Sequence, residues 1–85
     1  MSIIRIGRPL REYISLLAED DPELQELADF LSGFPVYPAG IELPEEHQYD
    51  VWYYADLLLA LDPTPGERRA CNAALADLEK AGFQP

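Results

Sequence analysis

The longest apolar stretch of the chain is PEEHQYDVWYYADLLLAL, residues 44–61, and it decides the fold. After its opening proline it contains no further proline or glycine, so a helix can run through it unbroken. An apolar arc this broad can contact more than one neighbour, which predicts that the other segments pack around this helix. The residues of the arc recur at helical spacing: Val51, Trp52, Tyr54, Ala55, Leu57, Leu58, Leu59 and Leu61.

Two shorter helices are predicted ahead of this stretch. Pro9 suits the first position of a helix over residues 9–18, whose apolar residues fall on one side. Asp21 before a proline predicts the N-cap of a second helix, over residues 22–32. Gly33 then predicts a left-handed residue that ends it.

A fourth helix is predicted over residues 65–81. Thr64 and Glu67 have the spacing of a capping box at its start, and Gly82 predicts a Schellman motif at its end. Only about three residues separate this helix from the helix of residues 44–61, and so short a connection makes the two an antiparallel hairpin.

The expected fold is therefore all-α, a small four-helix domain that takes in residues 1–85. This length is near the lower limit for a single unstapled core. Residues 1–8 are expected to form a basic arm or a short strand, and residues 33–43 a proline-rich apolar loop. A minor hairpin between residues 34–37 and 3–6 is a further expectation.

Charge is distributed very unevenly along the chain, whose formal net charge is −10. Residues 1–11 carry three arginines and no acid, whereas residues 12–62 carry thirteen acids and no lysine or arginine. Such a surface repels nucleic acid and anionic membranes and attracts basic protein surfaces. Five of the thirteen acids lie at predicted helix starts, where capping and the helix dipole alone favour them: Asp20, Asp21, Glu23, Glu45 and Glu46.

Two groups of residues are candidates for binding a partner. An acidic row on the second helix is either an ordinary solvated face or a surface for a basic partner. A strip on the third helix adds tyrosines, which give contact area at low entropic cost, unless the loop of residues 33–43 covers them. The candidate residues are Glu19, Glu23, Glu26, Asp29, Glu46, Tyr49, Asp50, Tyr53 and Asp56.

His47 and Cys71 are the only residues of their types. Cys71 falls on the apolar side of its predicted helix and is expected to be a buried thiol and not a nucleophile. His47 with Glu46 and Asp50 offers one imidazole and two carboxylates, a weak metal signal. A surface or boundary position is the alternative for His47, and neither catalysis nor a cofactor or metal is expected.

The arginines are expected to neutralise nearby groups. Arg5, Arg8 and Arg11 are predicted to pair with the acidic face of the same molecule. Arg68 and Arg69 lie at the positive end of the fourth helix, where cations are disfavoured, so compensation by the nearby end of the third helix and by Asp62 is expected.

These features favour a non-enzymatic protein-binding module. Our hypothesis is an inhibitor that docks on a basic surface of a larger protein. Compact acidic proteins of phages and other mobile elements, such as DNA mimics that block restriction or CRISPR machinery, share this charge profile. The analogy is one of composition. The alternative is a structural or adaptor subunit of an assembly, with Ala73, Ala76 and Tyr53 in the contact.

The setting follows from the same composition. A single cysteine and the absence of a signal peptide predict a cytoplasmic protein, and no apolar run is long enough to cross a bilayer. We expect a monomer or weak homodimer that binds neither membranes nor nucleic acid directly.

Overall fold

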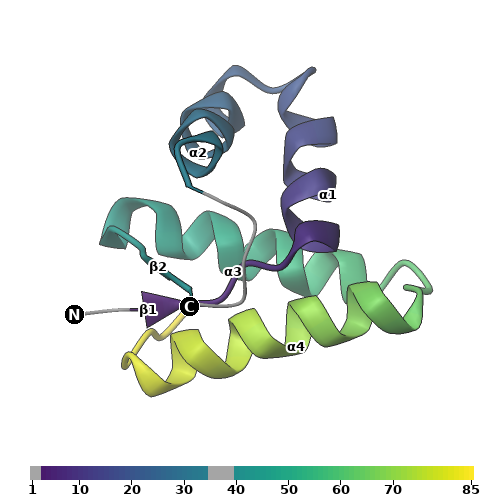
Figure 1. Cartoon of the computed structure of the whole chain (residues 1–85), viewed down its shortest axis with the longest axis vertical. Coiled ribbons are helices and arrows are strands. Elements are labelled where there is room, and N and C mark those ends of the chain that lie inside the picture. The colour runs from purple at the N-terminus through teal and green to yellow at the C-terminus, as the bar shows by residue number, and fades with distance from the viewer. Residues whose placement is uncertain (1–2, 35–39) are drawn as a thin grey trace.

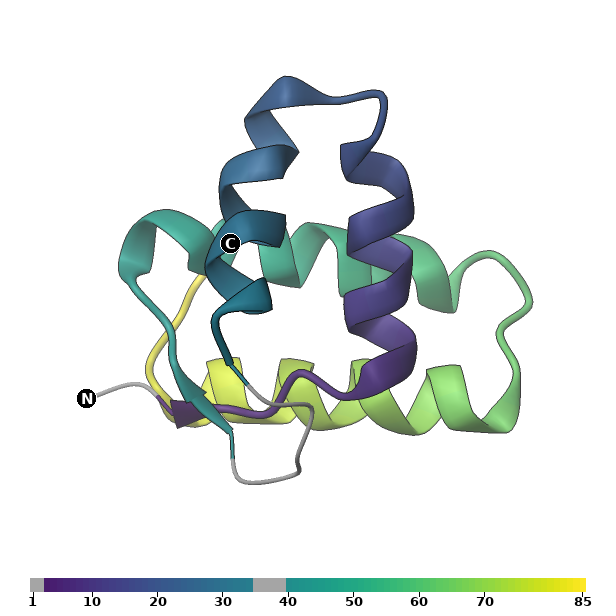
Figure 2. The same ribbon diagram turned by 45° about the horizontal axis from the view of Figure 1, so that its top comes forward.

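The computed structural model describes residues 3–34 and 40–85, which form four helices and one two-stranded antiparallel sheet (Figure 1). The all-α fold with four helices is confirmed. Figure 2 shows the pair α1–α2 lying across the pair α3–α4. In chain order the elements are β1 (Ile3–Ile4), α1 (Arg8–Ala18), α2 (Pro22–Ser32), β2 (Ile41–Glu42), α3 (Glu45–Leu59) and α4 (Pro65–Lys80).

The helices α2 and α4 begin at the predicted caps. Asp21 Oδ1 accepts a hydrogen bond from the backbone N–H of Glu23 at 3.1 Å. Thr64 and Glu67 form the full capping box, each side chain accepting from the other's backbone N–H, at 3.2 and 2.8 Å. Each cap supplies partners for amides that a helix start leaves unpaired, so these boundaries are fixed by local chemistry.

The two glycines predicted to end helices behave differently. Gly82 has φ +85°, and the N–H groups of Gly82 and Phe83 donate to the carbonyls of Glu79 and Leu78, as in a Schellman motif. Gly33 is not left-handed: its φ is −77°. There the N–H groups of two successive residues donate to carbonyls three residues earlier, so the last turn of α2 tightens instead of reversing.

The C-terminal end of α3 lies two residues earlier than predicted. The helix ends at Leu59, and Leu61 is 57% exposed and not part of the apolar stripe. The left-handed residue is Asp62, at φ +56°. The following Pro63 disfavours a helical conformation at that position, and aspartate tolerates the left-handed region better than most residues.

The core is built around α3, as the sequence predicts. Val51, Ala55 and Leu58 are buried, and α3 contacts all three other helices. Gln48 is also buried, and its Nε2 donates to the carbonyl of Leu43 at 3.0 Å, which fixes the segment that leads into the helix. The other elements contribute the buried residues Ile4, Ile6, Leu10, Ile14, Leu24, Leu27, Leu31, Ile41, Cys71, Ala74 and Leu78.

The strand that pairs with the N-terminus is not the predicted one. Register places Ile3 opposite Glu42 and Ile4 opposite Ile41. Of the predicted partner segment, Phe34 lies in a bend, and residues 35–37 are outside the described residues. Gly40 permits the observed pairing, because a Cβ there would lie 2.7 Å from Cγ2 of Ile3 and the residue has φ +81°.

Two of the N-terminal arginines hold the fold together, but not through the acidic face, so that prediction is wrong for both. Arg5 donates to the carboxylate of Asp77 on α4 through its backbone N–H, Nε and Nη2, at 2.8–3.0 Å. Arg11 is buried and donates to the carbonyls of Leu31 and Phe34 at the end of α2. The carbonyl of Leu31 lies in the last turn of α2 and carries part of the negative end of the helix dipole, whereas Phe34 follows the helix.

Candidate functional site

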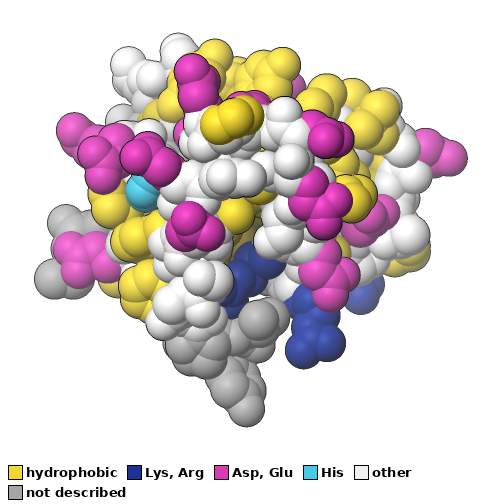
Figure 3. All heavy atoms as spheres, turned by 90° about the horizontal axis from the view of Figure 1, so that it is seen from above, with side chains coloured by type: hydrophobic (Ala, Val, Ile, Leu, Met, Phe, Trp, Pro, Cys, Tyr) yellow, Lys and Arg dark blue, Asp and Glu magenta, His cyan; other side chains and the backbone are white. Residues whose placement is uncertain are grey.

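The structure brings acids from two helices together around a shallow hollow. Glu26 and Asp29 of α2 and Glu46 of α3 line this hollow, which has a volume of about 470 Å³. Phe30 and His47 form its remaining lining, with ring centroids 5.2 Å apart. Figure 3 shows the acidic side chains (magenta) beside the single histidine (cyan). The two candidate groups therefore meet where α2 lies beside the start of α3.

We call the acidic surface the part of α2 and α3 that carries eight of the nine candidate residues. On α3, Glu46 lies one turn before Tyr49 and Asp50, and therefore joins the tyrosine strip to the acids of α2. Its residues are Glu23, Glu26, Asp29, Glu46, Tyr49, Asp50, Tyr53 and Asp56.

The ninth candidate, Glu19, lies elsewhere. It lines a separate groove between α1 and α2, with residues of α1. The predicted row Glu19, Glu23, Glu26 and Asp29 is therefore divided by the fold, because Glu19 follows the end of α1 and precedes the start of α2. The predicted helices of residues 9–18 and 22–32 already leave Glu19 between them.

No arginine or lysine in the described part of the chain forms an ion pair with a carboxylate of the acidic surface. Over residues 3–34 and 40–85, the one ion pair between an arginine or lysine and a carboxylate joins Arg5 to Asp77. Glu46 has only His47 Nε2, at 4.0 Å from Oε1, and its own side chain is 77% exposed. Most carboxylates of the acidic surface are exposed, and their charge acts on approaching molecules.

Tyr49 and Tyr53 are exposed, so the alternative in which the loop covers them is wrong. Their side chains are 53% and 45% exposed, and their rings stack at a centroid distance of 6.3 Å. Tyr49 also lies against Trp52 at 5.7 Å, and Tyr53 meets Tyr54 edge to face at 5.0 Å. These contacts hold two outward-facing rings in place before any partner arrives.

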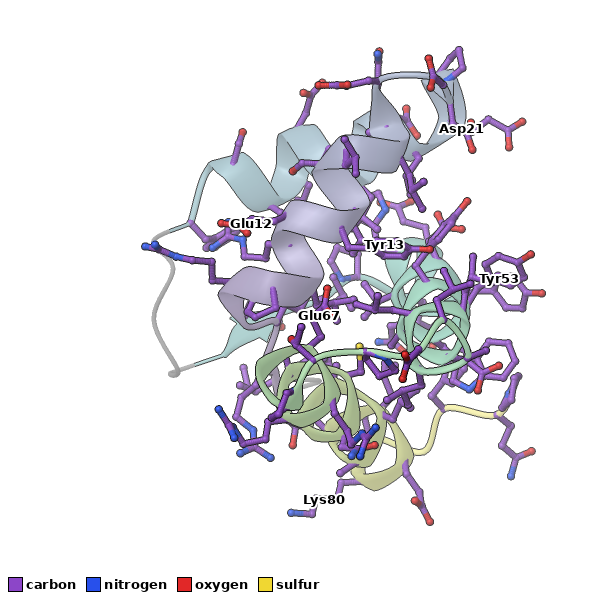
Figure 4. All side chains as sticks on the ribbon, turned by 90° about the vertical axis from the view of Figure 1, so that its right-hand side faces the viewer. Glu12, Tyr13, Asp21, Tyr53, Glu67 and Lys80 are labelled. Carbon is purple, nitrogen blue, oxygen red and sulfur yellow. The ribbon has the colours of Figure 1, made fainter. Side chains whose placement is uncertain are left out.

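One acid of the surface is recessed. Asp50 is half-buried, and burial raises the pKa of its carboxyl; nearby His47 lowers it and Asp21 raises it. Burial, followed by the charges of Asp21 and Asp50, also raises the pKa of Tyr54. In Figure 4, Tyr13 reaches from α1 toward α3, and Tyr53 projects outward from α3. Acids and tyrosines therefore share the edge where the two helix pairs meet.

The residues that suggested chemistry are placed as the sequence predicts. Cys71 is fully buried, and burial raises the pKa of its thiol to about 11, with a smaller contribution from Glu67. His47 is a boundary residue whose side chain is 12% exposed. Among the residues that the structure describes, no three His, Cys, Asp or Glu side chains are grouped to hold a metal ion. The same part of the chain contains no helix with the length and apolar character to cross a membrane.

The structure does not show the expected pairing of Arg68 and Arg69 with Asp62 among the described residues, and compensation by the end of α3 stays a prediction. Arg68 and Arg69 are exposed, and neither forms an ion pair with Asp62 or with another acid in the described part of the chain. Lys80, at the opposite end of α4, is exposed as well (Figure 4). The exposed cations therefore lie mainly on α4 and at the start of α1, away from the acidic surface.

Comparison with protein-family models, curated proteins and solved structures finds no match to this chain.

Proposed function

We propose that this chain is a non-enzymatic inhibitor, which binds a basic surface of a larger protein through the acidic surface. The partner surface is one that otherwise holds nucleic acid. Binding places carboxylates where phosphates would lie and blocks the approach of nucleic acid by bulk and by charge. The acidic surface on α2 and α3 would therefore act as a DNA mimic.

The observation that carries the proposal is the set of exposed, unpaired carboxylates on two adjoining helices. Exposed acids at helix starts need no partner, because the helix dipole stabilises them. Glu26 and Asp29 lie well inside α2, and Asp56 lies in the second half of α3, so the dipole does not explain them. Their charges remain available to steer a basic protein into contact and to set its orientation.

The tyrosines support the proposal with a second kind of contact. Tyrosine is enriched at the centres of protein interfaces, and its ring face attracts the cationic groups of arginine and lysine. Tyr49 and Tyr53 present stacked, half-exposed rings between carboxylates of the same helix. A basic partner therefore finds apolar contact and counter-charge side by side, which favours a specific complex over a loosely held one.

The test uses the protein as an immobilised bait in a lysate of its natural host, with mass spectrometry of what is retained. The wild-type bait is expected to retain a nucleic-acid-binding protein at low salt and to lose it steeply as salt rises. The variant Glu26→Lys/Glu46→Lys is expected to lose it at every salt concentration.

The matched control is Glu42→Lys/Glu79→Lys, which changes the net charge equally at two exposed acids outside the acidic surface. It is expected to retain the same protein as the wild type. Equal retention by all three baits would show that another face binds the partner. Equal loss from both variants would show that net charge alone is responsible.

The adaptor alternative has less support. Ala73 is half-buried, and of the two alanines predicted for a subunit contact only Ala76 is exposed. Sedimentation at micromolar concentration separates the two functions, since a structural subunit is expected to self-associate and the proposed inhibitor is expected to remain monomeric.

A further inference from the structure

A groove between α1 and α2 lies outside the acidic surface. Its volume is about 580 Å³, and Ala28 and Leu31 of α2 and Leu16 of α1 give it an apolar lining. In Figure 3 it is the hollow with arginine side chains (dark blue) at its lower end and acids (magenta) along one rim. No residue of the acidic surface lines it.

The groove exposes more apolar surface than the fold requires. Leu16 is 62% exposed, and Phe34, at the end of α2, is 39% exposed. Single exposed apolar residues are ordinary on a protein surface, but two large ones lining one groove are typical of a binding site. Leu16 also lines a second hollow, which lies toward α4, so its side chain separates the two hollows.

Charges are arranged along the α1 side of this groove in a fixed order. Arg8, Glu12 and Glu19 all line it, and they lie four and then seven residues apart, a spacing that keeps them on one side of a helix. All three are exposed and form no ion pair within the described part of the chain. The groove is therefore positive where α1 begins and negative along the rest of its length.

We propose that this groove binds an amphipathic helix of another protein. The apolar stripe of that helix lies on Leu16, Ala28 and Phe34. Its flank carries lysine or arginine opposite Glu12 and Glu19, and a carboxylate opposite Arg8.

Three features select this occupant. The helices α1 and α2 have eleven residues each, so the groove is about 16 Å long, the length of three helical turns. A third helix packs readily between two antiparallel ones, with its apolar stripe in the groove. A second copy of this chain is disfavoured, because two molecules of net charge −10 repel each other.

The test measures binding of a synthetic helical peptide to the full-length, ¹⁵N-labelled protein by NMR. The peptide has about 14 residues, with leucines at heptad spacing and lysines on the flank. Amide shifts are expected at Leu16, Ala28 and Leu31. One control peptide has serines in place of the leucines, and another has glutamates in place of the lysines. Both are expected to leave the groove unperturbed.

Variants locate the site. Leu16→Glu is expected to weaken binding of the leucine–lysine peptide at least about tenfold. The control Leu61→Glu alters a leucine that is 57% exposed and does not line the groove, and this variant is expected to bind the peptide as the wild type does. Glu12→Lys/Glu19→Lys leaves the apolar lining intact and is expected to weaken binding of the same peptide.

Three results would overturn the inference: no groove shifts at millimolar peptide, shifts confined to the acidic surface, or equal losses from Leu16→Glu and Leu61→Glu. The outcome is independent of the proposed inhibitor function. If Glu26→Lys/Glu46→Lys does not affect retention of the partner, the evidence for peptide binding to the groove is unchanged. If the peptide does not bind the groove, the evidence for the inhibitor function is likewise unchanged.

Discussion

Arg11 of α1 donates a hydrogen bond from Nη2 to the carbonyl oxygen of Leu31, in the last turn of α2. The same nitrogen reaches the carbonyl of Phe34 at 2.9 Å. The last turn of α2 contains no basic residue of its own, so α1 supplies a cation at the negative end of α2. One buried side chain thus joins the two helices that carry the groove, and α2 also carries part of the acidic surface.

Replacing Arg11 by methionine keeps much of the side-chain volume and removes the donors. Two carbonyls then lose partners in a largely buried position, and the free energy of unfolding is expected to fall by about 1–3 kcal/mol. Urea denaturation measures the loss. Arg8→Met, one turn earlier on the same helix and exposed, is the control and is expected to change stability little. Equal effects of the two substitutions would mean that the buried hydrogen bonds contribute nothing.

The pair of Arg5 and Asp77 predicts a pH dependence of stability. Hydrogen bonds from Arg5 hold the pKa of the Asp77 carboxyl below its usual range, although burial opposes them. A carboxyl with a lowered pKa in the folded state stabilises the fold above its unfolded pKa. The contribution is lost as pH falls through the lower, folded pKa.

Asp77→Asn is therefore expected to lower stability at neutral pH, and the difference from the wild type is expected to shrink as pH falls below the usual pKa of an aspartate carboxyl. Urea denaturation at several pH values measures the gap. Glu79→Gln, an exposed acid two residues along α4, is the control and is expected to show no such closing gap. A constant difference between Asp77→Asn and the wild type from neutral to acid pH would show that the ionised pair is not the cause.

Gly82 and Gly66 form a matched pair for backbone conformation. Gly82 has φ +85°, and a Cβ there would meet nothing within 4 Å, so the cost of Gly82→Ala is backbone strain alone, about 1 kcal/mol. Gly66, in the first turn of α4, has the same free space without a positive φ. Gly66→Ala is expected to be neutral or stabilising by about 0.4–1 kcal/mol. The melting temperature of each variant measures these effects. Similar changes in melting temperature for both variants would contradict the Schellman assignment.

Cys71 is expected to be unreactive while the protein is folded. Burial raises the pKa of its thiol to about 11, so little thiolate forms at pH 8 and the sulfur is inaccessible. A chromogenic disulfide reagent is expected to react slowly with the native protein and rapidly in denaturing urea. Rapid stoichiometric reaction of the native protein would contradict the buried position.

The helix boundaries could be read from the sequence wherever the deciding chemistry lies within a few residues. Asp21 with the following proline, the capping box of Thr64 and Glu67, and the ending at Gly82 are examples. Gly33 shows the limit, because a helix can also end by tightening its last turn, and no local signal separates the two endings.

Contacts between distant segments could not be predicted in the same way. Arg5 pairs with Asp77, which lies 72 residues later in the chain. Arg11 donates to a backbone carbonyl of α2, a group that every residue has and that no sequence pattern marks. The exposure of Tyr49 and Tyr53 could not be predicted either, because helical spacing does not show which other segments cover a helix face.

The proposed function requires that the acidic surface occupy a nucleic-acid-binding site on the partner. It is tested most directly by the binding of the captured partner to a fluorescent nucleic acid, measured as this chain is added. Wild-type chain and Glu42→Lys/Glu79→Lys are expected to displace the nucleic acid fully, and Glu26→Lys/Glu46→Lys is expected to fail at the same concentrations. A ternary complex in which the partner holds this chain and the nucleic acid together would contradict the claim.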